Sequence, residues 1–380
     1  MHSFYEFFAG GGMARCGLSS SWNCLFSNDF DRKKSETYVK NWGDDVHKTA
    51  DVKSLMTPDL PGDPDLAWAS FPCQDLSLAG GGAGLKGKRS GTFWPFWNLM
   101  KSLKEESRNP ALIVLENVCG TLTSHGGADF SAICQAFNTL DYRFGAIVID
   151  AAMFVPQSRP RLFVIGVRDD FEIPENLQSD EQSVIWNNKR LGEAQSKLSD
   201  GVRKKWVWWN LKSPSLRNIC FSDLIEDAVS DVKWHTQEQT QKMLDMMSDL
   251  NLAKVEKAKQ SGRKMVGTIY KRTRKDQSGR KMQRAEVRFD DIAGCLRTPA
   301  GGSSRQVIVV VDGQSVKSRL ISSRETARLM GLPDDYILPE KYNEAYHLTG
   351  DGVVVPVVRH IAEYILEPIL SKNKVLRAVA

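Results

Sequence analysis

The 380-residue sequence contains no apolar run that approaches the roughly 18 residues needed for a membrane-spanning helix. Its seven cysteines are odd in number and widely spaced, with no Cys-x-x-Cys pair. This pattern argues against a disulfide framework and against a tetrahedral zinc site. The start of the chain also lacks a charged-then-apolar leader. These absences favour a cytoplasmic protein with no membrane segment and no bound metal.

The net charge of +5 is concentrated in one segment. Residues 254–288 hold 13 Lys or Arg against 3 Asp or Glu, whereas the rest of the chain holds 38 basic and 43 acidic residues. Such a local cationic surplus is typical of a surface that binds a polyanion. A solvated basic loop is the alternative that composition leaves open.

Short apolar runs alternate with helix-length segments over the first 170 residues. This alternation predicts right-handed crossovers and a mainly parallel sheet that is covered on both faces. Ligands bind such sheets at the carboxyl ends of the strands, so motifs at those ends are candidates for a functional site. The strand-like runs cover residues 3–8, 22–27, 65–70, 112–116, 142–150 and 161–168, and the helix-like segments include 32–41, 93–106 and 130–140.

The alternation ends near residue 171. Residues 171–300 are polar and irregular, and a Gly-Ser cluster then precedes a strand-like run at 306–311 and helix-like segments at 323–330 and 356–366. We therefore predict two domains. An α/β sheet domain is formed by residues 1–170 plus 319–380, and a smaller, irregular domain, residues 171–318, is inserted into it.

The first strand runs into a glycine-rich turn, Phe4-Tyr-Glu-Phe-Phe-Ala-Gly-Gly-Gly-Met13. Glycines let the backbone pass close to a ligand, and the N-terminus of the following helix offers free N–H groups. The next strand ends in Asp29 and Phe30, a carboxylate suited to ribose hydroxyls and a ring suited to stacking on adenine. Asp51 follows a further short run. In this order the residues predict a pocket for an adenosine-containing cofactor, either S-adenosylmethionine or a nicotinamide dinucleotide.

Reactive side chains follow other strand-like runs. Cys73 stands in a Phe-Pro-Cys-Gln motif directly after one run, and the glycine-rich, basic segment 80–91 that comes next is typical of a lid over an anionic ligand. Glu116 ends another run, and Arg159 and Arg161 precede a third. A cysteine nucleophile, a carboxyl group for a ring nitrogen and guanidinium groups for an oxyanion or a phosphate form a chemically coherent set.

Six motifs occur in the order found in the cytosine-5 DNA methyltransferase family, which the sequence resembles over roughly residues 3–170 and 290–370. They are Phe-Ala-Gly-Gly-Gly, Pro-Cys-Gln, Glu-Asn-Val, Gln-x-Arg-x-Arg, Arg-Glu-Thr-Ala-Arg-Leu-Met-Gly (324–331) and Gly-Asp-Gly-Val (350–353). The resemblance implies the Rossmann-like fold of S-adenosylmethionine-dependent methyltransferases, in an enzyme of the bacterial and phage restriction-modification type. Residues 171–318 then take the place of the family's target-recognition domain.

The resemblance also implies a mechanism. The Cys73 thiolate adds to C6 of a flipped-out cytosine while Glu116 hydrogen-bonds and protonates N3. The activated C5 takes the methyl group of S-adenosylmethionine, and loss of the C5 proton and of the thiol restores the ring. Arg161 holds the cytosine O2 and the nearby phosphate, while Arg159 tunes the Cys73 environment and binds the flipped nucleotide. Neighbouring cations favour the thiolate, and the base must leave the duplex stack to react.

The resemblance also implies which residues bind the cofactor and the DNA. In this interpretation Asp29 contacts the ribose, Phe30 the adenine ring and Asp51 its amino group. The family often has glycine at the position of Met13 and asparagine at that of Asp351, so this sequence departs from the pattern there. The full cofactor set is Phe8, Ala9, Gly10, Gly12, Asp29, Phe30, Asp51, Val52, Pro72, Asp351 and Gly352. The DNA-binding set is Gln74, Ser77, Lys86, Lys88, Arg89, Arg272, Arg274, Arg297 and Arg305.

Three other functions share part of these features. An RNA cytosine-5 methyltransferase has the same chemistry, but the long basic insertion favours duplex DNA. A catalytically inactive DNA- and cofactor-binding regulator is expected to have lost Cys73 or Glu116, and both are present. A nicotinamide oxidoreductase shares the glycine turn and Asp29 but gives no reason for Pro-Cys-Gln or Glu-Asn-Val. We expect a monomer that acts on double-stranded DNA, with a cognate restriction endonuclease acting separately.

Overall fold

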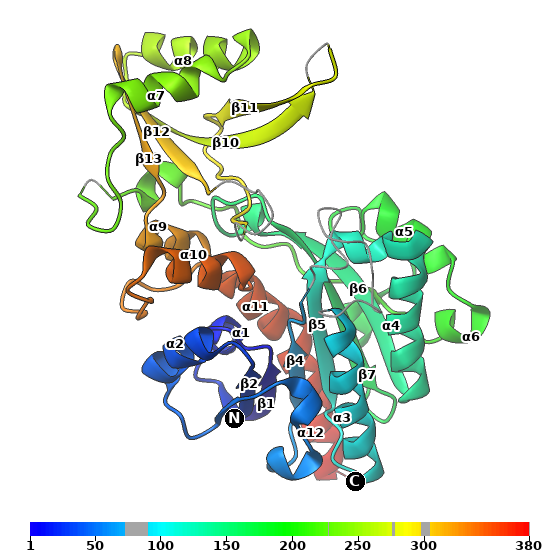
Figure 1. The fold of residues 1–380 in the computed structure, drawn as a ribbon. Coiled ribbons are helices and arrows are strands. Elements are labelled where there is room, and N and C mark those ends of the chain that lie inside the picture. Colours follow the sequence, from blue (N-terminus) through cyan, green and yellow to red (C-terminus); the bar gives the residue numbers. More distant parts are fainter. Residues whose placement is uncertain (73–89, 227, 276–277, 298–304, 380) are drawn as a thin grey trace. The chain divides into compact units, whose positions relative to one another are not determined.

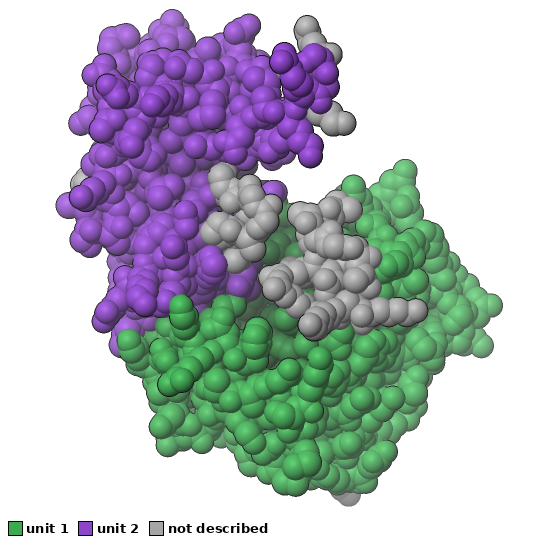
Figure 2. Space-filling model, in the orientation of Figure 1, with its two compact units in different colours: residues 1–150, 160–214, 353–380 green, residues 151–159, 215–352 purple. Residues whose placement is uncertain are grey.

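The computed structural model describes residues 1–72, 90–226, 228–275, 278–297 and 305–379. The chain forms two compact units, which are coloured separately in Figure 2. Unit 1 comprises residues 1–150, 160–214 and 353–380, and unit 2 comprises residues 151–159 and 215–352.

Unit 1 is built on a seven-stranded sheet with the order β3-β2-β1-β4-β5-β7-β6. The neighbours from β3 to β5 are parallel, and β7 runs antiparallel to both β5 and β6. The predicted mainly parallel sheet is therefore confirmed. The strands are β1 His2–Phe7, β2 Trp22–Asp29, β3 His47–Thr49, β4 Leu66–Ala69, β5 Leu112–Val118, β6 Tyr142–Asp150 and β7 Pro160–Arg168.

Helices cover both faces of this sheet, as Figure 1 shows. On one face Trp97 of α3 and Phe137 of α4 join Phe7 of β1 in a single hydrophobic cluster. On the other face the indole Nε1 of Trp22 donates to the Glu367 carboxylate at the start of α12, at 2.9 Å. The helices of unit 1 are α1 Met13–Leu18, α2 Arg32–Trp42, α3 Phe93–Glu105, α4 Ala128–Thr139, α5 Lys189–Ser196, α6 Asp200–Arg203, α11 Val355–Ile361 and α12 Glu367–Val379.

Local sequence explains where these helices begin and which side they bury. The Asp31 carboxylate accepts hydrogen bonds from the backbone N–H groups of Lys33 and Lys34, so it caps the first turn of α2. In α3 the buried side chains recur with the helical period, at Phe93, Phe96, Trp97, Met100 and Leu103, and form one apolar stripe against the sheet.

Unit 2 contains an antiparallel sheet with the order β11-β10-β12-β13. Helices α7 and α8 cover one face of it, where Met243 and Val255 pack against Ile269, Ala285 and Val309. The elements are α7 Gln237–Asp245, α8 Asp249–Gln260, β10 Met265–Lys275, β11 Lys281–Arg288, β12 Val307–Asp312, β13 Ser315–Leu320, α9 Ser323–Leu329 and α10 Tyr342–Asp351.

Several short elements complete the described chain. A small two-stranded sheet of unit 1 pairs β8, Gln178–Ser179, with β9, Trp208–Trp209. A π-helical segment, Ala362–Leu366, joins α11 to α12. The short 3-10 helices are Val52–Ser54, Thr57–Asp59, Ser90–Thr92, Cys119–Leu122, Ser124–Gly127, Ala151–Met153, Glu175–Leu177 and Phe221–Leu224.

Residues 171–318 contain more regular structure than the sequence pattern indicated. Helices α7 and α8 were missed because they are polar on most of their surface, and the strands of β10 and β11 carry cations where an apolar alternation is usual. The compact units also have other boundaries than the predicted domains. Residues up to 214 pack with unit 1, where the N–H of Val207 donates to the carbonyl of Phe144 at 2.7 Å. The assignment of catalysis and target recognition to the two predicted domains stays a prediction.

Within the described ranges, no helix combines the length and the apolar composition that crossing a membrane requires. The same residues include no cluster of three or more His, Cys, Asp or Glu side chains arranged to hold a metal ion.

Candidate active site

The glycine turn after β1 contains positive φ angles, which glycine adopts more readily than other residues. Phe8, Gly10 and Gly12 all have positive φ angles, of 57°, 56° and 79°. A Cβ atom on Gly12 would lie 2.4 Å from the indole nitrogen of Trp42, so the close approach there requires glycine. A Cβ on Gly10 would meet nothing within 4 Å. The turn therefore packs tightly on one side and leaves space for a ligand beside Gly10.

Asp29, at the end of β2, lies against this turn. Its carboxylate accepts hydrogen bonds from the N–H of Gly10 at 2.7 Å and from the N–H of Asp31 at 2.8 Å. Burial raises the pKa of the Asp29 carboxyl group, while the charge of Lys34 and the two N–H donors oppose the rise. The ring of the next residue, Phe30, is 68% exposed. A buried acid and an exposed aromatic ring thus stand side by side at one strand end.

The end of β3 joins the same edge of the sheet. The N–H of Ala50 donates to the carbonyl of Asp29 at 3.0 Å, and the N–H of Ala9 donates to the carbonyl of Asn28 at 2.9 Å. Asp51, the next residue, is exposed and accepts from the N–H of Lys53 at 3.0 Å, while Val52 is buried. The structure therefore brings together the predicted cofactor residues that follow β1, β2 and β3.

The residues at this edge fit an adenosine-containing cofactor. The carboxylate of Asp29 is an acceptor of the kind that binds ribose hydroxyls, and the Phe30 ring offers an accessible aromatic face. The open space beside Gly10 is where backbone and ligand can approach closely. Of the other cofactor candidates, Pro72 follows β4 in unit 1, whereas Asp351 and Gly352 belong to unit 2.

Glu6 is a site neighbour that the sequence analysis missed. It is 1% exposed near the end of β1, and its Oε1 accepts from the N–H of Arg15 at 3.2 Å. Among the described residues its Oε2 has no hydrogen-bond partner. Burial raises the pKa of Glu6 to about 8, although the Arg15 N–H and charge oppose the rise. The available signal was an acidic residue among the aromatic residues of the strand, Phe4, Tyr5 and Phe7.

A second group of predicted residues lies where β4 and β5 end. The Nδ2 of Asn117 donates to the carbonyl of Phe71 at 3.1 Å, and both residues are buried. Phe71 stands two residues before Cys73 in the sequence, and Asn117 directly follows Glu116. The hydrogen bond therefore ties the segment that leads to the predicted nucleophile to the segment that carries the predicted acid.

Glu116 and Arg161 form an ion pair on adjacent strands. In the antiparallel register of β5 and β7, Arg161 lies opposite Val118, two residues from Glu116. Side chains two residues apart on a strand point to the same face, so Glu116 and Arg161 are diagonal neighbours. Their Oε1 and Nε atoms are 3.2 Å apart, with side chains that are 8% and 17% exposed. The structure thus pairs two of the four predicted catalytic residues.

Arg159 lies in unit 2 and contacts backbone carbonyl groups there. It is 2% exposed, and its Nη2 donates to the carbonyls of Gly350 and Gly352 at 2.9 and 2.8 Å. Its Nη1 donates to the carbonyl of Leu296 at 3.2 Å. Through these bonds Arg159 connects the segment before β12 to the end of α10. The predicted role of Arg159 at the cytosine stays a prediction.

Six of the predicted residues lie outside the described ranges: Cys73, Gln74, Ser77, Lys86, Lys88 and Arg89.

The remaining predicted DNA-binding residues belong to unit 2. Arg272 and Arg274 are exposed on β10, and Arg297 is exposed at the end of a described range. Arg305 donates from Nη2 to the Oδ1 of Asn343 and lies with its guanidinium carbon 5.7 Å from the centre of the Tyr342 ring.

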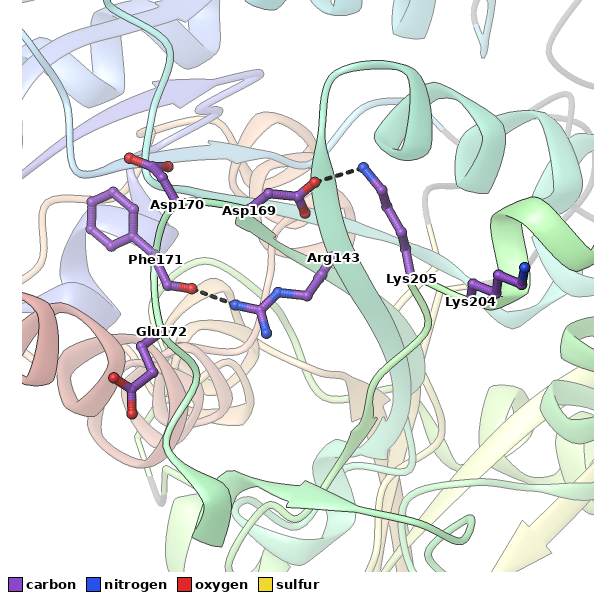
Figure 3. Close-up of a pocket in the computed structure, with 7 residues that line it drawn as sticks. All are labelled: Arg143, Asp169, Asp170, Phe171, Glu172, Lys204 and Lys205. Atoms are coloured by element: carbon purple, nitrogen blue, oxygen red, sulfur yellow. Dashed lines mark hydrogen bonds and ion pairs between the residues drawn. The ribbon is translucent and has the colours of Figure 1, made fainter.

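A hollow of about 580 Å³ lies elsewhere in unit 1 (Figure 3). Figure 3 shows Lys205 paired with Asp169, at 2.7 Å, and Arg143 bonded to the carbonyl of Phe171. These residues stand near the start of β6 and the end of β7. Since β7 is antiparallel to β5, its end lies at the edge of the sheet opposite Glu116. The hollow is therefore separate from the candidate site.

Comparisons with known proteins agree with this geometry. The model of a family described as C-5 cytosine-specific DNA methylase matches residues 2–367. The type II methyltransferase M1.ScrFI of Lactococcus lactis subsp. cremoris is 26% identical over 98% of this chain and 80% of its own length. M.HhaI of Haemophilus parahaemolyticus is 25% identical over 94% of this chain and 92% of its own length. The S. pombe Dnmt2 methyltransferase has a similar fold, with a TM-score of 0.61 at 16% identity over 97% of this chain and 99% of its own.

Proposed function

Because the chain belongs to the C-5 cytosine-specific DNA methylase family, we propose that it methylates C5 of a flipped-out cytosine in a specific duplex DNA sequence, through a covalent bond between Cys73 and C6. The family and the relatives establish the class of the enzyme, a DNA cytosine-5 methyltransferase. One observation carries the mechanistic part. Glu116 is paired with Arg161, and the adjacent Asn117 holds the carbonyl of Phe71, two residues before Cys73.

In the proposed mechanism the Cys73 thiolate adds to C6 and forms a carbon–sulfur bond, while Glu116 delivers a proton to N3. The electron pair that reaches C5 would then form the bond to the methyl group, whose bond to the sulfonium sulfur of the cofactor would break and leave a neutral thioether. The C5 proton leaves to a base, N3 returns its proton, and the carbon–sulfur bond breaks to regenerate the thiolate. Arg161, at 3.2 Å from Glu116, holds that carboxyl group in place and offers its remaining N–H groups to the cytosine O2 and a phosphate.

We propose S-adenosylmethionine as the cofactor, since it supplies the methyl group when bound. Asp29 and Phe30 would hold its ribose and adenine, and Asp51 its amino group. The space beside Gly10 and the exposed Phe30 ring support this assignment. The roles of Val52, Pro72, Asp351 and Gly352 at the cofactor belong to the same proposal.

Duplex DNA is the proposed substrate because the basic surplus of residues 254–288 suits a phosphate backbone. The similar proteins M1.ScrFI and M.HhaI are named as type II methyltransferases of bacteria. We therefore propose a monomer in the bacterial cytoplasm that protects DNA from a separate, cognate restriction endonuclease.

The proposal is tested with Cys73→Ala. We expect this variant to lose methyl transfer from labelled S-adenosylmethionine to duplex DNA and to keep its affinity for both ligands, because only the nucleophile is removed. DNA that contains 5-fluorocytosine should form a covalent adduct with the wild-type protein, since fluorine cannot leave C5 as a cation. Bisulfite sequencing of DNA from expressing cells identifies the modified base and its context.

Cys220→Ala is the matched control, because Cys220 is an exposed cysteine of unit 2. It should keep full activity and adduct formation. Turnover by the Cys73→Ala protein would remove Cys73 from its role. Label that enters transfer RNA and never duplex DNA would instead identify an RNA methyltransferase.

A further inference from the structure

Part of the hairpin formed by β10 and β11 extends beyond the rest of its sheet. β10 pairs with β12 only from Met265 to Ile269, whereas its pairing with β11 continues from Thr268 to Lys275. Residues 270–274 and 282–286, here called the arm, are therefore a two-stranded ribbon, which Figure 1 shows projecting past β12. At about 3.4 Å per residue the arm is roughly 17 Å long. Its base still packs against the rest of unit 2, where the N–H of Ala285 donates to the carbonyl of Met246 at 3.1 Å.

The two faces of the arm differ. The strand pairing places Tyr270 opposite Glu286, Arg272 opposite Arg284, and Arg274 opposite Met282, all on one face. Ala285 on the other face is buried in the cluster with α7 and α8. The face that carries Arg272 and Arg274, here called the arginine face, is thus the one turned away from that cluster.

Glu286 organises the arginine face. Its Oε2 lies 3.1 Å from the Nε of Arg272, and its Oε1 accepts hydrogen bonds from the Nε of Arg274 at 3.2 Å and from its Nη2 at 2.5 Å. The guanidinium of Arg272 also lies over the Tyr270 ring, with its carbon 5.2 Å from the ring centre. The Glu286 carboxylate and the Tyr270 ring therefore hold Arg272 and Arg274 in place, although both arginine side chains are about half exposed.

The charge of this face is not balanced within the arm. Arg272 and Arg284 stand directly opposite each other, and like charges in that position destabilise a strand pair. Glu286 is the single acidic residue among 270–274 and 282–286. Holding several cations together on an exposed ribbon favours a surface that meets an anionic partner.

We propose that the arm enters the major groove of the duplex with its arginine face towards the bases, and that Glu286 is a positioning residue that presents Arg272 and Arg274 to guanine. The inference rests on the proposed function, since it names how that substrate is recognised. The major groove accommodates a two-stranded ribbon, and guanine offers N7 and O6 as paired acceptors for a guanidinium fork.

The contacts of Glu286 favour base recognition over simple phosphate binding. Phosphate attraction needs only positive charge, and an acidic residue at the centre of the surface weakens it. A guanidinium group must instead be oriented to match two acceptors, and Glu286 restricts the orientation of both arginines because it contacts the Nε of Arg272 and both the Nε and the Nη2 of Arg274. Glu286 thus lowers the positive charge of the arginine face while it orients the guanidinium groups of Arg272 and Arg274.

The test uses the full-length protein, S-adenosylmethionine and a pool of duplexes that are randomised around a central cytosine. Bisulfite sequencing of the products gives the preferred bases at every position. For Glu286→Gln we expect the preference for guanine at one or two positions to fall about tenfold, within the range of discrimination that one bidentate pair supplies. Binding to random duplex should tighten, because a negative charge is removed.

Glu256→Gln is the matched control, since Glu256 on α8 pairs with Lys259 and its loss changes the net charge equally. Its sequence profile should equal that of the wild type. If Glu286→Gln tightens binding but keeps the wild-type profile, Glu286 is only a charge counterweight and the inference fails.

If Glu286→Gln does not fold, Arg272→Lys and Arg274→Lys test whether these two arginines recognise guanine. Each variant keeps the positive charge but loses the paired N–H donors of the guanidinium group, so each should lose the same preference for guanine. A uniform loss of affinity with an unchanged profile would identify phosphate contacts and overturn the inference. A wild-type protein that methylates no duplex in the pool would overturn the proposed function and the inference together.

Discussion

At the scale of single residues, Glu6 is a buried acidic residue of unit 1. Its carboxyl group is buried within β1, with one oxygen bonded to the Arg15 N–H and the other without a hydrogen-bond partner among the described residues. Burial disfavours the charged form, so the pKa of Glu6 is raised from 4.5 to about 8. The carboxyl group is therefore neutral over much of the range in which the unfolded chain would be ionised.

This environment predicts a pH-dependent stability. Between pH 4.5 and 8 the folded state binds more protons at Glu6 than the unfolded state does, so the stability that this group contributes is present below pH 4.5 and is lost as the pH rises to 8. Glu6→Gln, which cannot ionise, should become more stable than the wild type by on the order of a few kcal/mol at pH 9 and by much less at pH 5. Urea unfolding at both pH values measures the difference.

Glu256→Gln again serves as the control, because Glu256 is exposed on α8 and its substitution should leave the pH profile of unfolding unchanged. If the unfolding curves of Glu6→Gln and the wild type remain parallel from pH 5 to pH 9, Glu6 is ionised in the folded protein and the prediction is wrong.

At the scale of elements, the turn between β1 and α1 combines two different uses of glycine. Gly12 allows the turn to pack against Trp42 and Tyr38, whereas Gly10 borders open space. Both have positive φ angles, so an alanine at either position carries similar backbone strain. The two positions therefore separate the packing of the turn from the space that it leaves for a ligand.

We predict that Gly12→Ala mainly affects stability and that Gly10→Ala mainly affects ligand binding. Gly12→Ala should lose about 2 kcal/mol or more of stability, because its Cβ would overlap the Trp42 and Tyr38 rings. Gly10→Ala should lose only about 1 kcal/mol from backbone strain, but it should bind S-adenosylmethionine at least tenfold more weakly. Urea unfolding and isothermal titration calorimetry measure the two effects. Equal stability losses, or an unchanged affinity in Gly10→Ala, would contradict this division of roles.

At the scale of the whole molecule, charge is distributed unevenly along the chain. Residues 254–288 carry a surplus of cations, and this segment runs from α8 through β10 to β11 in unit 2. The remaining residues carry a small excess of acids. A protein that neutralises phosphates with one such segment releases counterions, so its affinity falls as salt is added.

Neutralising part of this segment should flatten that dependence. For Lys264→Gln combined with Arg280→Gln and Lys281→Gln, we expect weaker DNA binding and a slope of log K against log salt that is shallower by about 0.9 for each phosphate that the variant no longer neutralises. Fluorescence anisotropy across a salt series gives the slope. A triple variant of exposed unit 1 lysines, with Lys40, Lys101 and Lys374 changed to Gln, makes the same charge change and should keep the wild-type slope. An equal effect of both triple variants would assign the DNA surface elsewhere.

The sequence alone determined the class of fold, the order of the motifs and the family, because each depends on residues that are close together in the chain. The strands of the seven-stranded sheet were predicted within a few residues, apart from β3, whose residues are largely polar. Asp29 and Phe30 were predicted from their position at the end of a strand, and the structure places them at the turn that carries Gly10.

Only the tertiary structure decided which side chains meet. Arg159 and Arg161 are two residues apart in one motif, yet Arg161 pairs with Glu116 on β5 whereas Arg159 bonds to carbonyl groups of unit 2. Glu286 meets Arg272 and Arg274 because of the register between two strands. A motif reports the chemistry that a side chain can perform, but its partner depends on strand pairing and chain closure, which join residues that no local window of sequence contains.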